Sequence, residues 1–439
     1  MFHWLVALGL ATRDRYAVAL EHRDYRTMWL ANASAQAAAW ALIVSRAWFV
    51  YDETGMSSDV AVVTFAAMAP AFIVPPIAGV LADRLDRRTL LGYTYLLNLG
   101  ANVVLAVLAF AGQLEVWQVV LLSALNGVAR YAAMPVSQAL VANLVPRDIL
   151  LNALSLNAAT NHLSRLIGPG IVTPILALLG APVAFFVCTV FYLVSWWQVM
   201  HVRTRSTGDA GGGRSFVGPF IAGVRYIASM PLIAMVTVMV CFHCALTMAF
   251  ESALPAFSNE VLRDPAGFGI LMTAVGIGSS LGSIYIGGVH SALVRGRMLL
   301  AMGLLSGLGQ VVLAFAPNLL LAWFAALVMG WTQAAFMTLG QAITQSLADD
   351  RFRGRIASVN TMSFQGLMAL MNLVNGLFVD TFSASWVLAA NGAVFVGIML
   401  LSFLVATPRR VYLSGIPAEA HALPRDWVRA PSPAPSGRY

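Results

Sequence analysis

Residues 79–88 read Gly-Val-Leu-Ala-Asp-Arg-Leu-Asp-Arg-Arg, a run of ten residues with three arginines and two aspartates. An apolar stretch long enough to cross a membrane, 60–82, leads into this run, and a second one, 89–111, follows it. A charge cluster confined between two such stretches is typical of a short turn on the cytoplasmic face of a membrane. The run therefore predicts two membrane-spanning helices joined by a tight cytoplasmic loop.

The composition extends this prediction to the whole chain. Of its 439 residues, 59% are hydrophobic and only 10% are charged, whereas soluble domains carry about 25% charged residues. All 26 basic residues are arginines, which excludes a Walker A loop because that loop needs a lysine to hold the nucleotide phosphates. We therefore expect an all-α membrane protein that draws its energy from a gradient or from a partner.

Twelve apolar stretches have the length of a membrane span, which takes about 20 residues. The expected spans are 27–50, 60–82, 89–111, 116–137, 152–179, 182–200, 232–257, 266–289, 298–316, 319–346, 356–379 and 385–406. They define a cytoplasmic N-terminal segment 1–26, a first six-helix bundle 27–200, a cytoplasmic linker with an amphipathic helix 201–230, a second six-helix bundle 231–406 and a disordered cytoplasmic tail 407–439.

The arginines indicate the orientation of these spans. With the N-terminus in the cytoplasm, 22 of the 26 arginines fall in cytoplasmic segments, and only Arg263 falls in an external loop. The remaining three, Arg46, Arg130 and Arg165, lie within spans. This asymmetry is the positive-inside pattern of membrane proteins. It explains the net charge of +7 as a topology signal, so we expect a lipid bilayer around the chain and no nucleic-acid partner.

The pattern Gly-x-x-x-Asp-Arg-x-x-Arg-Arg at 79–88 resembles the signature loop of the major facilitator superfamily of secondary transporters. Stretches 24–29, 51–55, 144–146, 152–154 and 167–169 are similar to its enterobactin-exporter and macrolide-efflux branch. The resemblance implies a major facilitator fold of twelve transmembrane helices in two six-helix pseudo-repeat bundles. It also implies a bacterial inner-membrane protein with both termini in the cytoplasm, which we expect to act as a monomer.

The resemblance further implies that the loop is a gate. Its gating residues would be Gly79, Asp83, Arg84, Asp86, Arg87 and Arg88. Gly79 would let the second span approach a neighbour closely, and Asp83 and Arg84 would stabilise one conformation against the eleventh span. The family usually has glycine where this chain has Asp86, a residue type that tolerates left-handed backbone better than most. The alternative is that the loop only anchors the topology.

Polar residues within spans are the candidates for a substrate cavity. A charge near the bilayer centre costs about 2.5–3.5 kcal/mol on insertion scales, so it usually faces a cavity. In the superfamily, spans 1, 4, 7 and 10 line the central cavity, and each of these spans is polar here. The candidates are Asn32, Gln36, Arg46, Asn126, Arg130, Arg165, Gln333 and Gln341. For Arg46, near the outer end of its span, the alternative is a side chain that reaches the interface.

Glu251 is an acid within the seventh span, and His243 and Thr247 precede it at four-residue steps. On a continuous helix the three side chains share one face. Glu251 and His243 are therefore our candidates for proton coupling. The alternatives are that Glu251 pairs with an arginine and that His243 is a hydrogen-bonded core histidine.

No residue pattern indicates an enzyme. Cys241 and Cys244 flank His243, but they lie within an expected helix and no second cluster completes a tetrahedral metal site. The sequence contains no paired His/Asp cluster and no nucleophile with a base in the loops. We therefore expect no catalytic residues, no metal and no cofactor.

The resulting interpretation is a secondary exporter that works by alternating access and takes a small-molecule substrate near the midplane. Three intramembrane arginines against one buried acid favour an anionic, siderophore-like substrate, with export coupled to protons. Two motifs of proton-coupled drug exporters are absent: Ser123 stands in place of an arginine, and Val172-Thr173 in place of a second glycine pair. The alternatives are a multidrug or macrolide efflux pump, a lysophospholipid flippase, and a receptor or scaffold built on a transporter fold.

Overall fold

The computed structural model describes residues 18–146, 149–204, 206, 217–289 and 291–416, and within them it is helical with no β-strand. The first bundle contains η1 (Val18–Glu21), α2 (Arg23–Thr54), α3 (Ser57–Met68), η2 (Ala69–Phe72), α4 (Val74–Arg84), α5 (Arg87–Phe110), α6 (Val116–Leu144) and α7 (Leu150–Met200). The second contains α8 (Val217–Ser229), α9 (Pro231–Leu246), α10 (Leu254–Ala256), the π-helix η3 (Phe257–Val261), α11 (Gly267–Gly287), α12 (Ala292–Ala314), α13 (Leu319–Leu347), α14 (Asp350–Phe382), α15 (Ala384–Ser402) and α16 (Ala406–Ser414).

Among the described residues, eight helices are each long and apolar enough to cross a membrane, and two bent helix pairs raise this number to ten. The 51-residue α7 reverses at Gly180, where φ is 78° and ψ is 179°, a conformation that glycine adopts far more readily than other residues. Its two arms therefore cross separately. With the second arm and the 32-residue α2, the twelve expected passes are accounted for, and the all-α membrane fold is confirmed.

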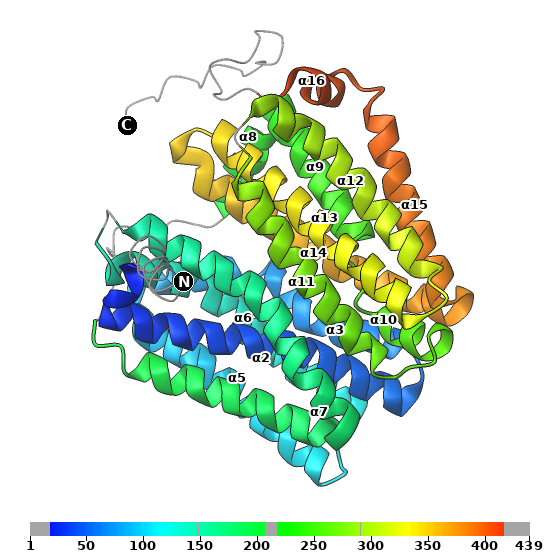
Figure 1. Ribbon diagram of the computed structural model, residues 1–439. Helices are drawn as coiled ribbons and strands as arrows, with labels where there is room; N and C mark the ends of the chain where they lie inside the picture. The colour runs from blue at the N-terminus through cyan, green and yellow to red at the C-terminus, as the bar shows by residue number, and fades with distance from the viewer. Residues whose placement is uncertain (1–17, 147–148, 205, 207–216, 290, 417–439) are drawn as a thin grey trace, which may run out of the picture.

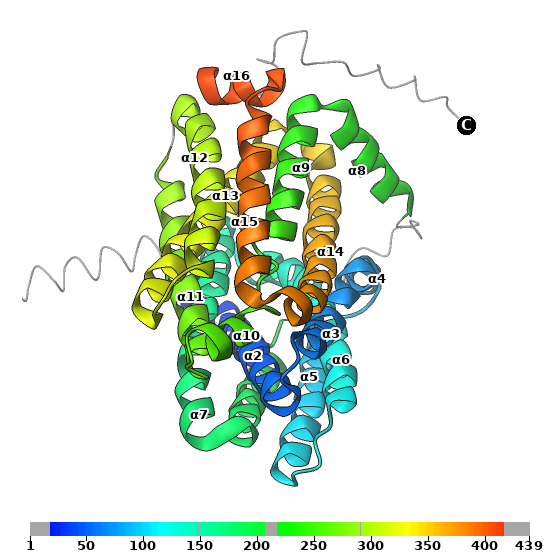
Figure 2. The ribbon, with the colours of Figure 1, turned by 90° about the vertical axis from the view of Figure 1, so that its right-hand side faces the viewer.

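The two ends of the bundles differ in how closely the bundles approach (Figures 1 and 2). We call the end that holds η1, Val202–Thr204 and α16 the linker end, and the end that holds Gly55, Gly112 and Ser383 the far end. The bundles touch at the far end and diverge toward the linker end.

The seam between the bundles is formed by α7 on α11 and by α3 on α14. Glycines permit both contacts. A Cβ atom at Gly276 would lie 2.5 Å from the Arg165 carbonyl oxygen, and one at Gly376 would lie 2.6 Å from the Ser57 carbonyl oxygen. Near Gly376, the Asp380 carboxylate accepts hydrogen bonds from the backbone N–H groups of Ser57 and Ser58, at 2.7 and 2.9 Å. The far end is therefore closed by backbone contact and hydrogen bonds.

The second span is not the single helix that we expected over 60–82. It bends by 44° at Ile73, between η2 and α4. Pro70, Pro75 and Pro76 flank the bend. Proline lacks the backbone N–H and clashes with the carbonyl four residues earlier, so a continuous helix is not favoured here.

The prediction of a disordered tail is also wrong for the first residues of the tail, because residues 406–414 form α16. Val411 and Tyr412 are buried, and the Tyr412 hydroxyl lies 2.9 Å from Ser402 Oγ. The apolar face of α16 covers the linker end of α12, where a Cβ atom at Gly296 would clash with the Val411 carbonyl oxygen. Residues 417–439 and 1–17, which make up most of the two expected terminal segments, lie outside the described residues. The expected amphipathic helix of the linker coincides with α8.

The chain after α7 is attached to the first turn of α2 through Asp24. The Asp24 carboxylate accepts hydrogen bonds from Thr204 Oγ1 at 2.6 Å, from Thr204 N at 2.8 Å and from Arg203 N at 3.1 Å. Burial alone would raise the pKa of this carboxyl, but these bonds and the charge of Arg23 hold the pKa below its usual value. The ionised carboxylate is thus the form that stabilises this attachment.

We expect Asp24→Asn to lower the Tm of the purified protein at neutral pH. Because the folded-state pKa of Asp24 is depressed, its stabilisation is present above the unfolded pKa of about 4 and is lost as the pH falls through the folded value. The Tm difference between Asp24→Asn and wild type should therefore shrink below about pH 4. Asp52→Asn, at an exposed position of the far end, is the control, and a pH-independent difference for Asp24→Asn would contradict the prediction.

We expect Gly376→Val to destabilise the protein, because the added side chain pushes α14 away from α3. Overpacking of this kind costs about 1–3 kcal/mol, which thermal unfolding in detergent will report as a lower Tm. The matched control is Gly397→Val on α15, where a Cβ atom meets nothing within 4 Å. Equal Tm values for the two variants would show that the α3–α14 contact is not tight.

Candidate functional site

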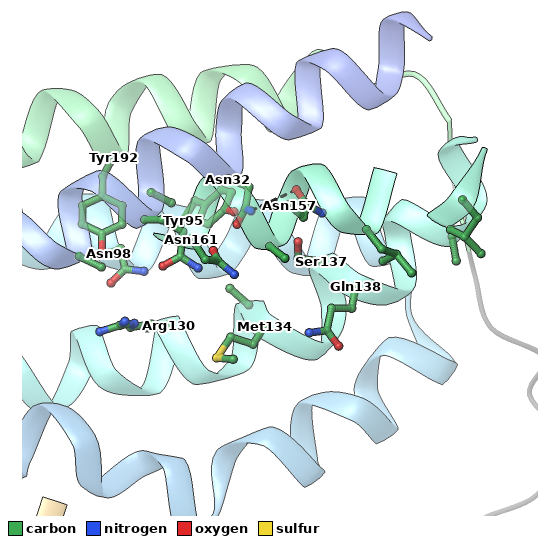
Figure 3. A pocket seen from close by; sticks show the side chains of 18 of the residues that line it. Asn32, Tyr95, Asn98, Arg130, Met134, Ser137, Gln138, Asn157, Asn161 and Tyr192 are labelled. Carbon is green, nitrogen blue, oxygen red and sulfur yellow. Dashed lines mark hydrogen bonds between the residues drawn. The ribbon is translucent and has the colours of Figure 1, made fainter. Parts of the chain in front are cut away.

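A cavity of about 680 Å³ lies in the first bundle between α2, α5, α6 and α7 (Figure 3). It extends to the linker end, where Leu150 and Gln345 of α13 line it. Besides Gln345, its polar lining comes from all four of these helices and consists of Asn32, Gln36, Tyr95, Asn98, Arg130, Ser137, Gln138, Asn157, Asn161 and Tyr192. The cavity thus combines one cation with many neutral hydrogen-bonding groups, an arrangement suited to a polar organic molecule.

Three of the eight candidate cavity residues, Asn32, Gln36 and Arg130, line this cavity. Asn32 and Gln36 lie four positions apart on α2, so they occupy the same face of the helix. Asn32 Nδ2 donates to Asn157 Oδ1 at 3.4 Å, which links α2 to α7. Asn157 was not among the candidate cavity residues, although it shares a face of the fifth span with Arg165.

A second, much smaller space lies deeper between the bundles. This deep chamber has a volume of about 30 Å³, and its walls include Arg46, Asn126, Arg130, Tyr192 and Glu251. Arg130 and Tyr192 line both the chamber and the large cavity. Arg46 does not reach the interface, the alternative that its position left open, because its side chain is only 6% exposed and faces the chamber.

The guanidinium groups of two of the arginines lie over the ring of Trp40. The guanidinium carbon Cζ of Arg165 lies 4.7 Å from the centre of the Trp40 ring, and that of Arg130 lies 5.8 Å from it. Contacts of this kind hold a cation over an aromatic face. Arg165 also approaches Ser279 of α11, with Nη1 at 3.5 Å from Oγ, so it reaches across the seam. Trp40 was not among the residues predicted from the sequence, although its position four residues after Gln36 places it on the same side of α2 as Gln36.

Glu251 faces these arginines from the second bundle. It is 2% exposed, and the charges that act on it most strongly are those of Arg165 and Arg130. Its Oε2 atom has no hydrogen-bond partner among the described residues, and neither has Nε of Arg165. One buried arginine, two half-buried arginines and one buried carboxylate therefore lie near the seam. Their excess of positive charge favours an anionic ligand.

The prediction that His243, Thr247 and Glu251 share one helix face is wrong, because α9 ends at Leu246. A new short helix, α10, begins at Leu254, and Pro255 in its first turn has no N–H to donate to the Glu251 carbonyl. His243 lies in the core of the second bundle, with its ring nitrogen 3.1 Å from Ser306 Oγ and its ring stacked near Phe336. It is a buried core histidine that the helix break separates from Glu251.

Amide side chains from neighbouring helices satisfy the backbone groups that this break releases. Gln310 donates to the Leu246 carbonyl at 3.2 Å, Gln333 donates to the Thr247 carbonyl, and Asn375 donates to the Ala249 carbonyl. Asn372 accepts from the Ser252 N–H at 3.2 Å. Gln333, which we expected in the substrate cavity, thus supports the broken helix instead. Gln341 is exposed on α13 and lines neither of the two cavities.

The signature loop is attached to its own bundle. Asp86 caps α5 by accepting from Thr89 N at 3.1 Å, and it accepts from Ser206 N at 2.9 Å. Arg87 donates to the Ala139 carbonyl at 3.3 Å, and Arg88 donates to the Met200 carbonyl. These bonds join the α4–α5 turn to α6, to the end of α7 and to the linker.

One expectation for the loop has a different outcome. A Cβ atom at Gly79 would meet nothing within 4 Å, so Gly79 does not permit a close helix contact in this structure. Arg84 is exposed. Because the bundles are apart at this end (Figure 1), its contact with the eleventh span in another conformation stays a prediction. The side chain of Asp83 lies outside the described part of the structure.

Comparison with known proteins agrees with this architecture. Residues 16–425 match the model of the transmembrane secretion effector family. The chain is 21% identical over 337 residues to the staphyloferrin A transporter of Staphylococcus aureus, covering 76% of this chain and 84% of that one. It is 17% identical over 394 residues to macrolide efflux protein A of Streptococcus pyogenes, covering 89% and 97%.

Solved structures of transporters have the same fold. A POT family transporter in complex with 5-aminolevulinic acid superposes with a TM-score of 0.72 at 11% identity, covering 88% of this chain and 96% of that one. A mutant of the nucleoside transporter NupG superposes with a TM-score of 0.70 at 12% identity, covering 87% and 100%. The family match spans nearly the whole chain, and the twelve-pass architecture agrees with it: the chain belongs to the transmembrane secretion effector family of the major facilitator superfamily.

Proposed function

We propose that this transporter exports a small organic anion of the siderophore type across the bacterial inner membrane, by alternating access and with coupling to protons. The observation that carries the proposal is a group of three arginines that faces a single buried carboxylate at the seam: Arg46 is buried, and Arg130 and Arg165 are half-buried. A buried excess of positive charge attracts anions and rejects cations. The similarity to the staphyloferrin A transporter supports a siderophore-like substrate.

The arginine distribution supports a cytoplasmic linker end. On that assignment the 680 Å³ cavity opens to the cytoplasm, and the Asp380–Ser57 contact and the hydrogen bond from Tyr51 to Glu260, 2.9 Å long, close the external end. This is the form that loads substrate from the cytoplasm. Export then requires the bundles to part at the far end and to close at the linker end, where the signature loop lies.

Glu251 is the coupling residue in this proposal. When ionised, it neutralises part of the charge of Arg165 and Arg130. When protonated, it leaves both arginines to an anionic substrate, so proton and substrate occupancy are linked through the same two cations. Its position beyond the end of α9 lets it move with the unwound segment and not with a rigid helix. His243 has no part in this step, because its ring is enclosed by Phe336 and Phe395.

A second candidate is macrolide export, which the similarity to macrolide efflux protein A over 89% of the chain favours. The cavity offers the aromatic rings of Tyr95 and Tyr192 for contact with an apolar substrate. The two candidates differ in their dependence on the arginines, because a neutral or cationic drug gains nothing from buried positive charge.

Transport into everted membrane vesicles tests the proposal. We expect vesicles that contain the protein to accumulate labelled staphyloferrin A when a proton gradient is imposed and to lose this accumulation when the gradient is dissipated. A catecholate siderophore and a labelled macrolide are measured in parallel. Accumulation of the macrolide alone would replace the first candidate by the second, and accumulation of none of the three would overturn both.

We expect Glu251→Gln to abolish accumulation driven by the proton gradient while preserving exchange of labelled for unlabelled substrate in proteoliposomes. The neutral amide keeps the shape of the side chain but binds no proton, so only the coupled step is lost. Glu53→Gln, at an exposed position of the far end, is the matched control. Full gradient-driven accumulation by Glu251→Gln would exclude Glu251 as the coupling residue.

A further inference from the structure

The deep chamber contains hydrogen-bonding atoms that have no partner among the described residues. Arg46, Asn126 and Glu251 line it, and their side chains are only 6%, 4% and 2% exposed. In each of them one atom lacks a hydrogen bond: Nη1 of Arg46, Nδ2 of Asn126 and Oε2 of Glu251. Since the great majority of buried polar groups in proteins are hydrogen-bonded, three such atoms around one small space require an explanation.

The hydrogen bonds of the other polar atoms of these side chains show which kind of group remains without a partner. Arg46 Nε donates to the Leu42 carbonyl at 3.2 Å, and Asn126 Oδ1 accepts from Asn102 Nδ2 at 3.4 Å. The groups that remain on the first bundle are therefore donors, one of them charged. Arg130 adds a second cation at the boundary with the large cavity. On its first-bundle side the chamber thus presents unpartnered donors and no acceptor for them, while Glu251 lies on the opposite side. The arginines favour an acceptor with a negative charge.

The size of the chamber limits the ligand. A cavity needs a volume of at least about 10–15 Å³ to hold one water molecule. The chamber, with about 30 Å³, therefore has room for about two oxygen atoms. Two carboxylate oxygens fit this space, whereas an aromatic ring does not. Because Arg130 and Tyr192 belong to both spaces, a group on a molecule in the large cavity can reach the chamber past them.

We propose that the deep chamber is a subsite for one carboxylate group of the substrate. Nη1 of Arg46 and Nδ2 of Asn126 donate to this carboxylate, Arg130 holds the mouth of the chamber, and the rest of the substrate lies in the large cavity. The opposing carboxylate of Glu251 prevents a second anionic group from entering. This inference rests on the proposed function and narrows its substrate class to molecules with a carboxylate on a flexible arm, in preference to catecholates, whose anionic oxygens are carried by a ring.

The test is a binding measurement on the purified, full-length protein in detergent. Calorimetric titration compares tricarballylate, which has three carboxylates, with its triamide, which has the same shape and no charge. We expect tricarballylate to bind and the triamide to bind at least about tenfold more weakly, since hydrogen bonds to charged groups are stronger than those to neutral ones. Equal affinity for the two compounds, or no binding of tricarballylate at millimolar concentration, would overturn the subsite.

Variants of the chamber residues test whether tricarballylate binds in the chamber. Arg46→Gln should weaken tricarballylate binding by about ten- to hundredfold, and Asn126→Leu by about five- to tenfold. Glu251→Gln should strengthen it, because a repelling charge is removed. The controls are Arg225→Gln on α8 and Asn360→Leu on α14, where Asn360 accepts from Thr237 Oγ1 at 3.4 Å within the second bundle. Wild-type affinity in both chamber variants would overturn the proposal.

Arg46→Lys separates the charge of the side chain from its shape. Lysine retains the charge but not the planar fork of donors, so this variant should bind more tightly than Arg46→Gln and more weakly than wild type. If Arg46→Gln does not elute as a folded species, the comparison of tricarballylate with its triamide on wild type decides the question.

The failure of the subsite and the failure of the export proposal give different results. Tricarballylate binding of the expected kind without siderophore accumulation in vesicles would overturn the export proposal and leave the subsite. Accumulation together with Arg46-independent binding would overturn the subsite alone.

Discussion

Backbone groups inside a membrane must find partners within the protein, because no water is present to replace a lost hydrogen bond. A continuous helix meets this constraint, but the break after Leu246 leaves backbone carbonyls without helical partners. The side-chain amides of Gln310, Gln333 and Asn375 donate hydrogen bonds to three of these carbonyls. This interaction allows Glu251 to lie off the axis of α9, at the seam and opposite arginines of the other bundle. The charge distribution of the site depends on it.

The seam explains why charge is tolerated at this depth. Gly276 and Gly376 bring backbones of the two bundles into contact, and the same α7–α11 contact holds Arg165 beside Ser279. The Trp40 ring keeps Arg165 and Arg130 on one side of α2 without neutralising them. The positive charge is thus held in place by packing and aromatic contacts, and it remains available to an anionic ligand and to Glu251.

Most of the fold was predictable because its determinants are local. Spans of apolar residues, arginine-rich turns and the 79–88 loop predict twelve helices, their order and their grouping into two bundles. The errors have local causes as well. Pro70, Pro75 and Pro76 bend the second span, and Pro255 lies in the first turn of a new helix within the seventh. In both regions the apolar composition continued across the proline, so hydropathy predicted one helix where the backbone forms two. The first part of the tail was mistaken for disorder because α16 is short and contains a proline and two adjacent arginines among few apolar residues.

The candidate site was predictable in its residue types and less so in their roles. The sequence by itself determined that Arg46, Arg130, Arg165 and Glu251 lie within the membrane, because each interrupts an apolar span at a cost that only an interior position offsets. Only the tertiary structure decided that Gln333 supports a helix break, that His243 belongs to a core, and that Trp40 connects two arginines. The physical reason is that span membership follows from the transfer free energy of each segment, which is a property of composition. Which side chains meet depends on helix breaks, on glycine contacts and on the relative position of the two bundles, and these join residues more than one hundred positions apart in the chain.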